Sequence, residues 1–464
     1  MQFLSCPNEF WLSVRQPLLM MNPGTLEYEH RRQEGYEVER YAKQLERFRQ
    51  DDTRSVDFQR TFQTAELATR SDVIVTDIAT GEIDIYEIKG SSKVKDEHYD
   101  DVAFQKVTAE RSGSKVRNTY LVTLNGDYVR EGEIDVEQLF NVTDITESVN
   151  SRLAGTEAGI LAAFEYLRSE PTPSLADYCV GNKFDCRFIQ LNFSDLPERD
   201  LFELWTMKHE KRRELLREGI VDLRDIPSSF HLSDKQRKHV ELARANEPVI
   251  DREAIVERMN SWEYPLQFLD YETFAYAIPQ FDGVRPFQQM VFQYSLHTIR
   301  SPGSELEHAE FLSRGDDGPP RSVAESLREA MADGVGTVFV WYESFEKGRN
   351  TEMADMFPDL ADFFNEVNAK TVDLMKIFSE NLYVHPGFKG RNSIKKVLPV
   401  LVPDLRYEGL GIPDGLTATI KWFRAATWTT MSDAERVSVF NDLLEYCELD
   451  TKAMVEIYNV LRTL

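Results

Sequence analysis

Two carboxylates follow a short apolar run in the segment Pro265-Leu-Gln-Phe-Leu-Asp-Tyr-Glu-Thr-Phe. The run from Leu266 to Leu269 predicts a buried strand, and residues two apart in a strand point to the same side. Asp270 and Glu272 would therefore project together, and like charges held so close raise each other's pKa unless a cation lies between them. The segment also fits a strand that ends in a polar turn, so these residues alone leave both interpretations open.

Two later segments favour the metal-binding interpretation. Residues 336–346 read as a second buried strand, and it ends in the acid Glu346. Near the C-terminus, residues 443–454 have a helical pattern. Positions four apart share a helix face, so Tyr446 and Asp450 would project together.

This ordered set resembles the DnaQ-like exonucleases of the RNase H-like fold, in the subclass with tyrosine in its third motif. The resemblance implies that Asp270, Glu272, Glu346 and Asp450 bind Mg²⁺ or Mn²⁺ and that Tyr446 holds the attacking water. It also implies hydrolysis from a 3′ end. Glu346 departs from the family, which usually has aspartate in the second motif. The longer side chain keeps the charge but changes the metal geometry.

A second group of chemically capable residues lies on a predicted hairpin. Residues 61–75 alternate as a strand does, a turn follows at Gly81, and residues 83–89 form the next strand. Glu87 and Lys89 would share one strand face, with Asp72 on the paired strand. Two carboxylates can hold Mg²⁺, and a lysine can orient water and stabilise charge on a phosphate. An exposed hairpin face with an ion pair would give the same pattern.

The order of elements around this hairpin resembles the PD-(D/E)XK nuclease fold of the RecB type. A helix is expected over residues 27–48, another over 96–109, and a strand over 118–125. The resemblance implies a nuclease site made of Asp72, Glu87, Lys89 and Gln105, with a first-helix acid near Glu39. The family usually has tyrosine four residues after the glutamine, whereas this chain has Ala109.

The cysteines suggest a remnant of an iron–sulfur site. RecB-like relatives, including CRISPR-associated exonucleases, hold a cluster with one N-terminal cysteine and three after the nuclease fold. Cys6, Cys179 and Cys186 match three of these positions, but Leu191 and Asn192 stand where the fourth is expected. Four thiolates are the usual requirement, so we expect a lost cluster or an atypical three-cysteine site. Cys447 is expected to be a small buried hydrophobe.

Basic residues occur in two segments that could contact nucleic acid. Residues 208–226 resemble a helix-hairpin-helix with its turn at Gly219, where freed amides could approach a phosphate. A solvated basic face on linker helices fits equally well. Residues 387–399 form a basic, glycine-bearing loop that enters a helix. Asp373 is expected to cap a helix, with support of the metal ligands as the alternative. The candidate nucleic-acid contacts are Lys211, Arg212, Arg213, Lys395 and Lys396.

Composition limits the class of protein. The chain has 464 residues, 42% hydrophobic and 11% aromatic, which supports more than one packed domain. It has no apolar run long enough for a membrane helix and no visible secretory signal, so we expect a cytoplasmic protein without membrane contact. A formal charge of −25 argues against non-specific coating of DNA, although local basic patches can still bind it.

The chain as a whole resembles an uncharacterised bacterial family, the domain of unknown function 2779, which joins a RecB-like domain to a DnaQ-like domain. The sequence segments that resemble this family are Leu4-Ser-Cys-Pro, Tyr86-Glu-Ile-Lys, Asp101-Val-Ala-Phe-Gln, Phe268-Leu-Asp-Tyr-Glu-Thr, Ser393-Ile-Lys-Lys-Val-Leu-Pro and Glu445-Tyr-Cys-Glu-Leu-Asp-Thr.

We therefore expect an α/β protein with three parts. A PD-(D/E)XK domain would span residues 1–168, a mostly helical linker 169–262, and an RNase H-like DEDD exonuclease domain 263–464. The expected function is metal-dependent cleavage of DNA in repair or defence. The alternatives are an RNA exonuclease and a nucleic-acid-binding scaffold with one or both sites inactive. Protein partners are not indicated.

Overall fold

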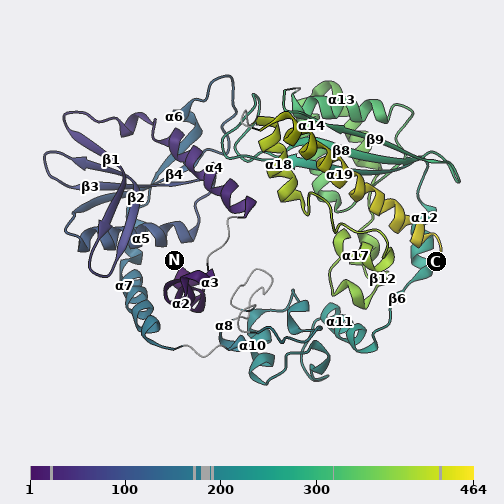
Figure 1. The fold of residues 1–464 in the computed structure, drawn as a ribbon, viewed down its shortest axis with the longest axis horizontal. Helices are drawn as coiled ribbons and strands as arrows, with labels where there is room; N and C mark the ends of the chain where they lie inside the picture. The colour runs from purple at the N-terminus through teal and green to yellow at the C-terminus, as the bar shows by residue number, and fades with distance from the viewer. Residues whose placement is uncertain are drawn as a thin grey trace. The chain divides into compact units, whose positions relative to one another are not determined.

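The computed structural model describes residues 2–20, 25–170, 174–178, 189, 193–316, 318–427 and 431–464. The chain divides into two compact units. Unit 1 is built mainly from Met1–Ser174 and Ala275–Gln288, and unit 2 mainly from Phe193–Phe274 and Gln289–Leu464. The expected α/β class is confirmed, because both units combine a five-stranded sheet with helices (Figure 1). Residues 193–262, which were expected to form a linker, cluster with unit 2.

Unit 1 has the sheet order β1-β2-β3-β4-β5, in which β3 and β4 are parallel and the other neighbours are antiparallel. Helix α5 makes the crossover between the two parallel strands, and α7 packs on α5 around Val102, Leu121 and Val149. In chain order the elements are α1 Gln2–Ser5, α2 Pro7–Arg15, α3 Pro17–Met20, α4 Leu26–Ala42, η1 Glu46–Phe48, β1 Arg54–Gln63, β2 Ala68–Asp77, β3 Ile83–Lys89, α5 Asp96–Arg111, β4 Val116–Leu124, α6 Val136–Leu139, β5 Phe140–Asp144 and α7 Thr146–Arg168.

Unit 2 has the sheet order β11-β10-β7-β8-β9. Strands β7, β8 and β9 are antiparallel, whereas β10 runs parallel to both β7 and β11. Its elements are α8 Leu175–Tyr178, η2 Leu201–Glu203, α10 His209–Arg217, η3 Leu223–Asp225, α11 Asp234–Ala245, β6 Val249–Ile250, α12 Arg252–Asn260, β7 Leu266–Phe274, β8 Met290–Ile299, β9 Leu306–Leu312, α13 Pro319–Ala330, β10 Thr337–Val340, α14 Glu343–Met356, η4 Pro358–Leu360, α15 Ala361–Lys370, β11 Thr371–Asp373, α16 Lys376–Ser379, β12 Tyr383–Val384, η5 Pro386–Phe388, α17 Ile394–Leu401, α18 Gly415–Thr427 and α19 Asp433–Leu461.

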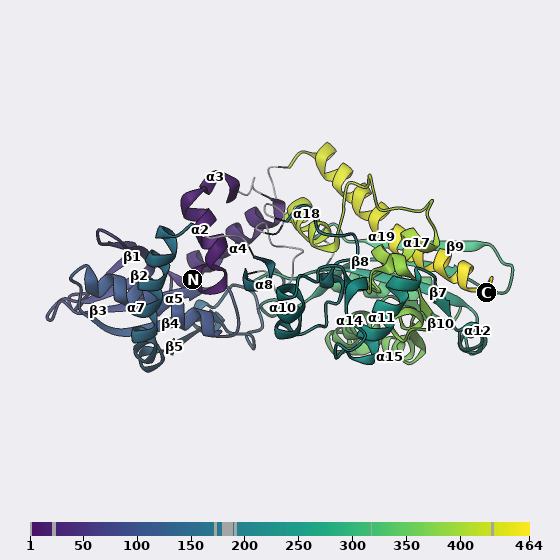
Figure 2. The same ribbon diagram turned by 90° about the horizontal axis from the view of Figure 1, so that it is seen from below.

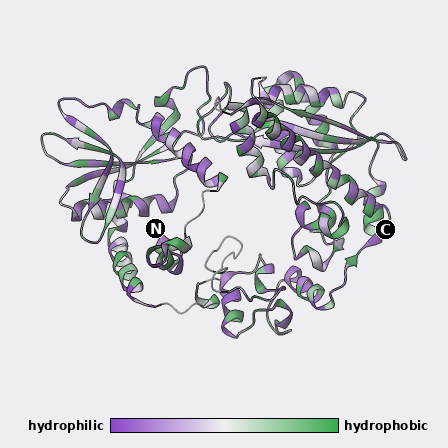
Figure 3. Ribbon diagram, in the orientation of Figure 1, coloured by the Kyte–Doolittle hydropathy of each residue, from purple (hydrophilic) through white to green (hydrophobic). Residues whose placement is uncertain are grey.

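The unit 2 sheet lies between layers of helices, which Figure 2 shows from below. Its central strand β7 is buried along nearly its whole length, as its apolar sequence predicts. One core packs Leu269 and Tyr271 against helices α13 to α15. The other packs Phe268 and Phe339 against α19. The helices carry hydrophilic residues beside hydrophobic ones (Figure 3), as expected of helices that cover a sheet with one face.

Three expectations about local structure were wrong. Residues 61–75 are not one strand, because β1 ends at Gln63 and β2 begins at Ala68. Most of β1 was missed, because polar and charged residues separate its apolar side chains, Val56, Phe58 and Phe62. Strand β7, by contrast, carries Asp270 and Glu272 as expected and continues to Phe274. Glu346 does not end a strand, because β10 stops at Val340 and Glu346 lies in the first turn of α14. The predicted first helix ends at Ala42, well before Phe48.

Candidate functional site

Three carboxylates converge in unit 2. Ligand oxygens of Asp270, Glu272 and Asp450 all lie within 4.8 Å of one another. Asp270 and Glu272 come from β7, where their spacing gives both side chains the same face. Asp450 comes from α19, which packs across that face of the sheet. We call these three residues the carboxylate cluster.

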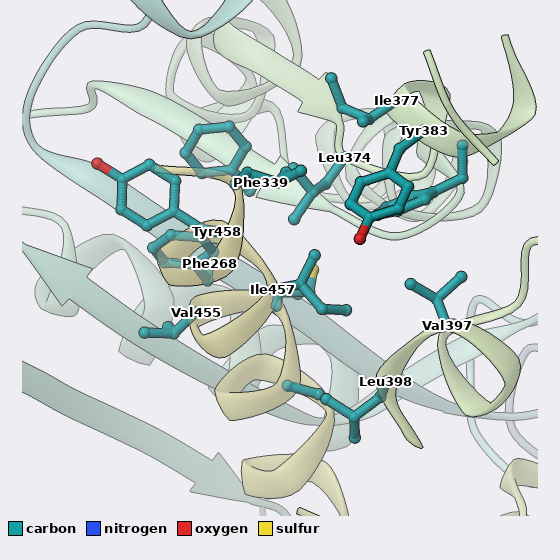
Figure 4. Close-up of a cluster of buried hydrophobic side chains, with 14 of the residues drawn as sticks. Phe268, Phe339, Leu374, Ile377, Tyr383, Val397, Leu398, Val455, Ile457 and Tyr458 are labelled. Carbon is teal, nitrogen blue, oxygen red and sulfur yellow. The ribbon is translucent and has the colours of Figure 1, made fainter. Parts of the chain in front are cut away.

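Helix α19 is held on the sheet by apolar and polar contacts together. In the apolar core the rings of Phe268, Phe339 and Tyr458 meet, with the Phe268 and Tyr458 centroids 5.7 Å apart (Figure 4). On β8, the side-chain amide of Gln293 donates to the Leu443 carbonyl at 2.8 Å. The hydroxyls of Ser295 and Thr451 lie 2.7 Å apart. Ser295 on β8 pairs with Asp270 on β7. The hydrogen bond between Ser295 and Thr451 therefore also brings Asp450, the residue before Thr451, beside Asp270.

Burial makes the carboxylate cluster electrostatically costly without a cation. Desolvation, followed by repulsion from Asp450, raises the pKa of both Asp270 and Glu272 well above the ordinary values. Burial also raises the pKa of Asp450 to about 6, although hydrogen bonds from Tyr407 and Tyr446 oppose the shift. Oxygen ligands of this kind suit Mg²⁺ or Mn²⁺. A bound divalent ion would offset the repulsion between the three carboxylates. Without the ion, protonation of the carboxylates relieves that repulsion.

Glu346 lies close to the carboxylate cluster but is held differently. Its side chain is buried, and burial followed by repulsion from Asp373 raises its pKa to about 8. Its charge in turn raises the pKa of Asp270. Among the described residues, the Oε2 atom of Glu346 has no hydrogen-bond partner. An unpartnered buried oxygen is costly, and metal coordination would satisfy it.

Asp373 fixes the helix that carries Glu346. Its carboxylate accepts hydrogen bonds from the backbone amides of Tyr342 at 3.1 Å and Glu343 at 3.2 Å, at the start of α14. Asp373 is therefore not the N-cap residue of the helix that follows it, but its carboxylate caps the start of α14 from the neighbouring strand β11. Tyr342, at the turn from β10 into α14, adopts a φ of 89°, which is unusual for a residue with a side chain. The cap thus stabilises a strained turn that aims Glu346 inward.

Two tyrosines and a lysine surround Asp450. The Tyr407 hydroxyl donates to Asp450 Oδ1 at 2.6 Å. The Lys395 ammonium donates to the Tyr446 hydroxyl oxygen at 3.1 Å and lies 5.0 Å from the Tyr446 ring centroid. Burial and the nearby acids, Asp450 first, raise the pKa of Tyr446 far above its ordinary value. Tyr446 is therefore a phenol at neutral pH, and its one hydroxyl proton is donated to Asp450.

Tyr407 was not identified as a site residue from the sequence. Lys395 was identified only as a candidate nucleic-acid contact in a basic loop. Tyr407 lies in the loop between α17 and α18, where no periodic pattern identifies a functional position. Lys396 is exposed, whereas Lys395 points toward Tyr446. Of these two candidate nucleic-acid contacts, only Lys395 therefore reaches the carboxylate cluster.

The residues predicted in unit 1 also come together. The Glu87 carboxylate accepts a hydrogen bond on each oxygen, from the Lys89 ammonium at 2.8 Å and from the Gln105 side-chain amide at 2.7 Å. Asp72 lies on the paired strand and accepts from the Ile88 amide at 2.8 Å. We call Asp72, Glu87, Lys89 and Gln105 the hairpin cluster. Strands β2 and β3 bring its two acids together, and α5 supplies Gln105.

The charges of the hairpin cluster are strongly perturbed. Burial, followed by repulsion from Asp72, raises the pKa of Glu87 to about 7. Burial lowers the pKa of Lys89, but the carboxylates of Glu87 and Asp101 outweigh it and raise that pKa above its ordinary value. Lys89 also bonds Asp101 at 2.6 Å. The lysine is therefore a permanent cation that can orient water or neutralise charge but cannot act as a base near neutral pH.

Glu39 reaches the hairpin cluster through an intermediate residue. The Gln59 amide donates both to Glu39 at 2.6 Å and to Asp72 at 3.0 Å. Burial raises the pKa of Asp72, and repulsion from Glu39 adds to the shift. Neither Gln59 nor Asp101 was singled out from the sequence, because each acts through a partner that only the folded sheet brings near. Ala109, where the family usually has tyrosine, is fully buried.

Several other predicted residues are not brought to either cluster. Cys6 caps α2. Cys447, by contrast, is buried beside the carboxylate cluster, with its sulfur 3.9 Å from Asp270 Oδ2. Cys179 and Cys186 lie outside the described residues, so the expected remnant cluster stays a prediction. In the basic run, Lys211 donates to the His231 carbonyl and Arg213 to the Ala176 carbonyl, while Arg212 is buried.

The predicted helix-hairpin-helix turn uses its amide within the fold. The Gly219 amide donates to the Leu216 carbonyl at 3.1 Å and so closes helix α10. Gly219 adopts a φ of 78°, which glycine accommodates without strain. The turn is therefore a helix cap, and its amide does not face outward as a phosphate contact would require.

A second group of potential metal ligands lies where α19 crosses the same sheet, with His297 on β8, His308 on β9 and Glu448 on α19. Atoms of His297, His308 and Glu448 lie within 4.8 Å of one another. The imidazole rings are stacked with an interplanar angle of 21°. Ring nitrogens coordinate in the plane of the ring, so two nearly parallel rings do not converge on one ion.

The fold and site thus define an α/β protein with two buried clusters of acidic side chains. Residues 267–393 match the profile of a domain of unknown function, DUF2779. This range contains Asp270, Glu272 and Glu346 but not Tyr446 or Asp450. No helix in the described parts of the chain has the length and apolar character needed to span a bilayer.

The chain is also similar to an uncharacterized protein of Ureaplasma parvum serovar 3, UU173, with 28% identity over 221 residues. The similarity covers 42% of this chain and 31% of the relative. The chain thus matches about a third of the length of that relative. No solved structure matches the chain.

Proposed function

We propose that unit 2 is a metal-dependent exonuclease that hydrolyses phosphodiester bonds at the 3′ end of a nucleic-acid strand, DNA in the first place. The observation that carries this proposal is the convergence of Asp270, Glu272 and Asp450 in a buried site. The sheet order, with three antiparallel strands followed by parallel ones, supports an RNase H-like fold for the unit.

The donor set fits Mg²⁺ or Mn²⁺. All its ligands are carboxylate oxygens, their pKa values are raised in the absence of a cation, and Glu346 offers an oxygen without a protein partner. Asp270, Glu272 and Asp450 would hold the ions, with Glu346 as a fourth ligand. Bound divalent ions polarise the phosphate and lower the pKa of water.

The protein groups would supply orientation and charge. Hydrolysis requires a water oxygen to attack phosphorus while the bond to the preceding 3′ oxygen breaks and that oxygen takes up a proton. The Tyr446 phenol, once turned away from Asp450, would donate a hydrogen bond that orients the water, and Tyr407 fixes the Asp450 carboxylate. Lys395 adds a positive charge where the phosphate gains negative charge.

The hairpin cluster supports a second proposal, that unit 1 is an independent nuclease centre of the PD-(D/E)XK kind. The bonds from Lys89 and Gln105 to Glu87, with Asp72 alongside, favour it. Asp72 and Glu87 would hold the metal ion, and Lys89 would orient water. The parallel pair β3 and β4 joined by α5 supports the corresponding fold.

The test is degradation of strands labelled at either end, single- and double-stranded, as DNA and as RNA. We expect Mn²⁺-dependent shortening from the 3′ end that Asp270→Asn abolishes, with the exposed Glu445→Gln as control. A preference for RNA would revise the substrate. Binding without cleavage by the wild-type protein would instead identify a scaffold with inactive sites.

A further inference from the structure

A cavity of about 460 Å³ lies in unit 2 beside the loop that leads into α17. One wall comes from the segment that runs from η2 into α10 and includes Phe202, Trp205, His209 and Arg212. Residues 390–393 form the other wall. We call this cavity the Trp205 pocket. It is separate from the carboxylate cluster and from the hairpin cluster.

Trp205 is exposed yet fixed in position. Its side chain is 63% exposed, whereas large apolar side chains usually avoid water. The indole N–H donates to the Gly390 carbonyl at 3.1 Å, which holds the ring against the loop. Trp205 also lines a neighbouring cavity of about 510 Å³. A rigid exposed ring that borders open space on more than one side is suited to stacking with a planar ligand.

The loop that holds Trp205 requires glycine at its closest approach. Gly390 has a φ of +70°, and a Cβ there would lie 2.1 Å from Cε1 of His239 on α11. Only glycine therefore lets the loop lie so close to α11 while its carbonyl accepts from Trp205. The ring position thus depends on specific packing between two segments far apart in sequence.

The charge of the Trp205 pocket differs from that of the protein as a whole. No carboxylate is found among the described residues that line it, although the chain carries a formal charge of −25. His209, Arg212 and Arg391 contribute basic groups. The Arg212 guanidinium lies 5.2 Å from the Phe202 ring centroid. Cations combined with aromatic rings are what a nucleotide requires, because they meet its phosphate and its base.

The Trp205 pocket is connected to the carboxylate cluster through α17. Ser393, at the N-cap of α17, lines the pocket. Lys395, two residues further on, donates to the Tyr446 hydroxyl. A helix advances about 1.5 Å per residue, so the two sites lie within the span of a few nucleotides. A strand whose end lies at the carboxylates can therefore continue along the start of α17 toward Trp205.

We propose that the Trp205 pocket binds a nucleotide of the single strand whose 3′ end enters the carboxylate cluster, with the base stacked on Trp205 and a phosphate paired with Arg391. This inference rests on the proposed exonuclease function for the direction of the strand. It adds the substrate class, a single-stranded end, because base stacking on a side chain requires an unpaired base.

The test is binding of a fluorescein-labelled oligothymidylate of about 15 nucleotides to the full-length protein in Ca²⁺, measured by anisotropy. Trp205→Leu should weaken binding by about fivefold or more, because the stacking surface is lost. Trp205→Phe should retain most of the affinity. Arg391→Glu should also weaken binding, whereas Arg328→Glu, an exposed charge reversal on α13, should have little effect.

Two further measurements separate this proposal from the proposed function. Mn²⁺ affinity should be the same in Trp205→Leu and wild type, because the metal ligands are unchanged. Intrinsic tryptophan fluorescence should be quenched by oligothymidylate in the wild-type protein and much less so in Trp205→Phe. Wild-type affinity in both Trp205→Leu and Arg391→Glu would overturn the proposal. Weakened binding in these variants, in a protein that does not cleave, would support the pocket and refute the exonuclease.

Discussion

Replacing Asp450 with asparagine should stabilise unit 2 when no metal is bound. Burial raises the pKa of Asp450 from 3.8 to about 6. As pH rises, the unfolded chain therefore loses this proton first, and the folded state becomes less stable from about pH 4 until about pH 6. A shift of about two units corresponds to about 3 kcal/mol at pH 8. Asparagine avoids this cost, and its Oδ1 can still accept the hydrogen bond from Tyr407.

The assay is thermal unfolding followed by circular dichroism at pH 4 and pH 8, in EDTA and in Mn²⁺. At pH 8 in EDTA, Asp450→Asn should raise the unfolding temperature of unit 2 by about 6–12 °C, and at pH 4 by much less. Mn²⁺ should stabilise the wild type but not the variant. Glu445→Gln on the exposed face of α19 is the control. A variant less stable than wild type at pH 8 in EDTA would refute this electrostatic account.

Three further predictions concern individual side chains. Tyr446→Phe should slow single-turnover 3′ trimming by about 10²–10³ with unchanged Mn²⁺ affinity; a full rate would mean that Tyr446 only packs beside the site. Tyr407→Phe removes a hydrogen bond that lowers the pKa of Asp450, so the acid limb of the pH–rate profile should move to higher pH; an unmoved limb would exclude that coupling. Lys89→Met should remove any cleavage that remains in an Asp270→Asn background; if that background has no residual cleavage, unit 1 is a binding or inactive module.

The sequence predicted the positions that depend on local periodicity. The two-residue spacing of Asp270 and Glu272 and the four-residue spacing of Tyr446 and Asp450 place side chains on the expected faces of β7 and α19. Strand pairing between β2 and β3 likewise brings Asp72 near Glu87. In each case a short-range repeat determines which side of one element a residue occupies.

The sequence could not predict contacts that depend on how elements pack. Tyr407 reaches Asp450 from a loop without a repeating pattern, and Gln59 connects Glu39 to Asp72 only because β1 pairs with β2. The edge strand β1 is rich in polar residues, and of its apolar side chains only Phe62 is buried in the core. Arg212 looked like a surface charge, yet it is buried. Hydropathy alone does not show when a charged residue packs against an aromatic ring.

The most direct test of the central claim is anomalous diffraction from crystals of the full-length protein soaked in Mn²⁺. We expect anomalous peaks about 2.2 Å from oxygens of Asp270, Glu272 and Asp450 in the wild-type protein. These peaks should be lost in Asp270→Asn. Peaks only beside His297, His308 and Glu448, or no peak in unit 2, would contradict the assignment of the carboxylate cluster as the metal site.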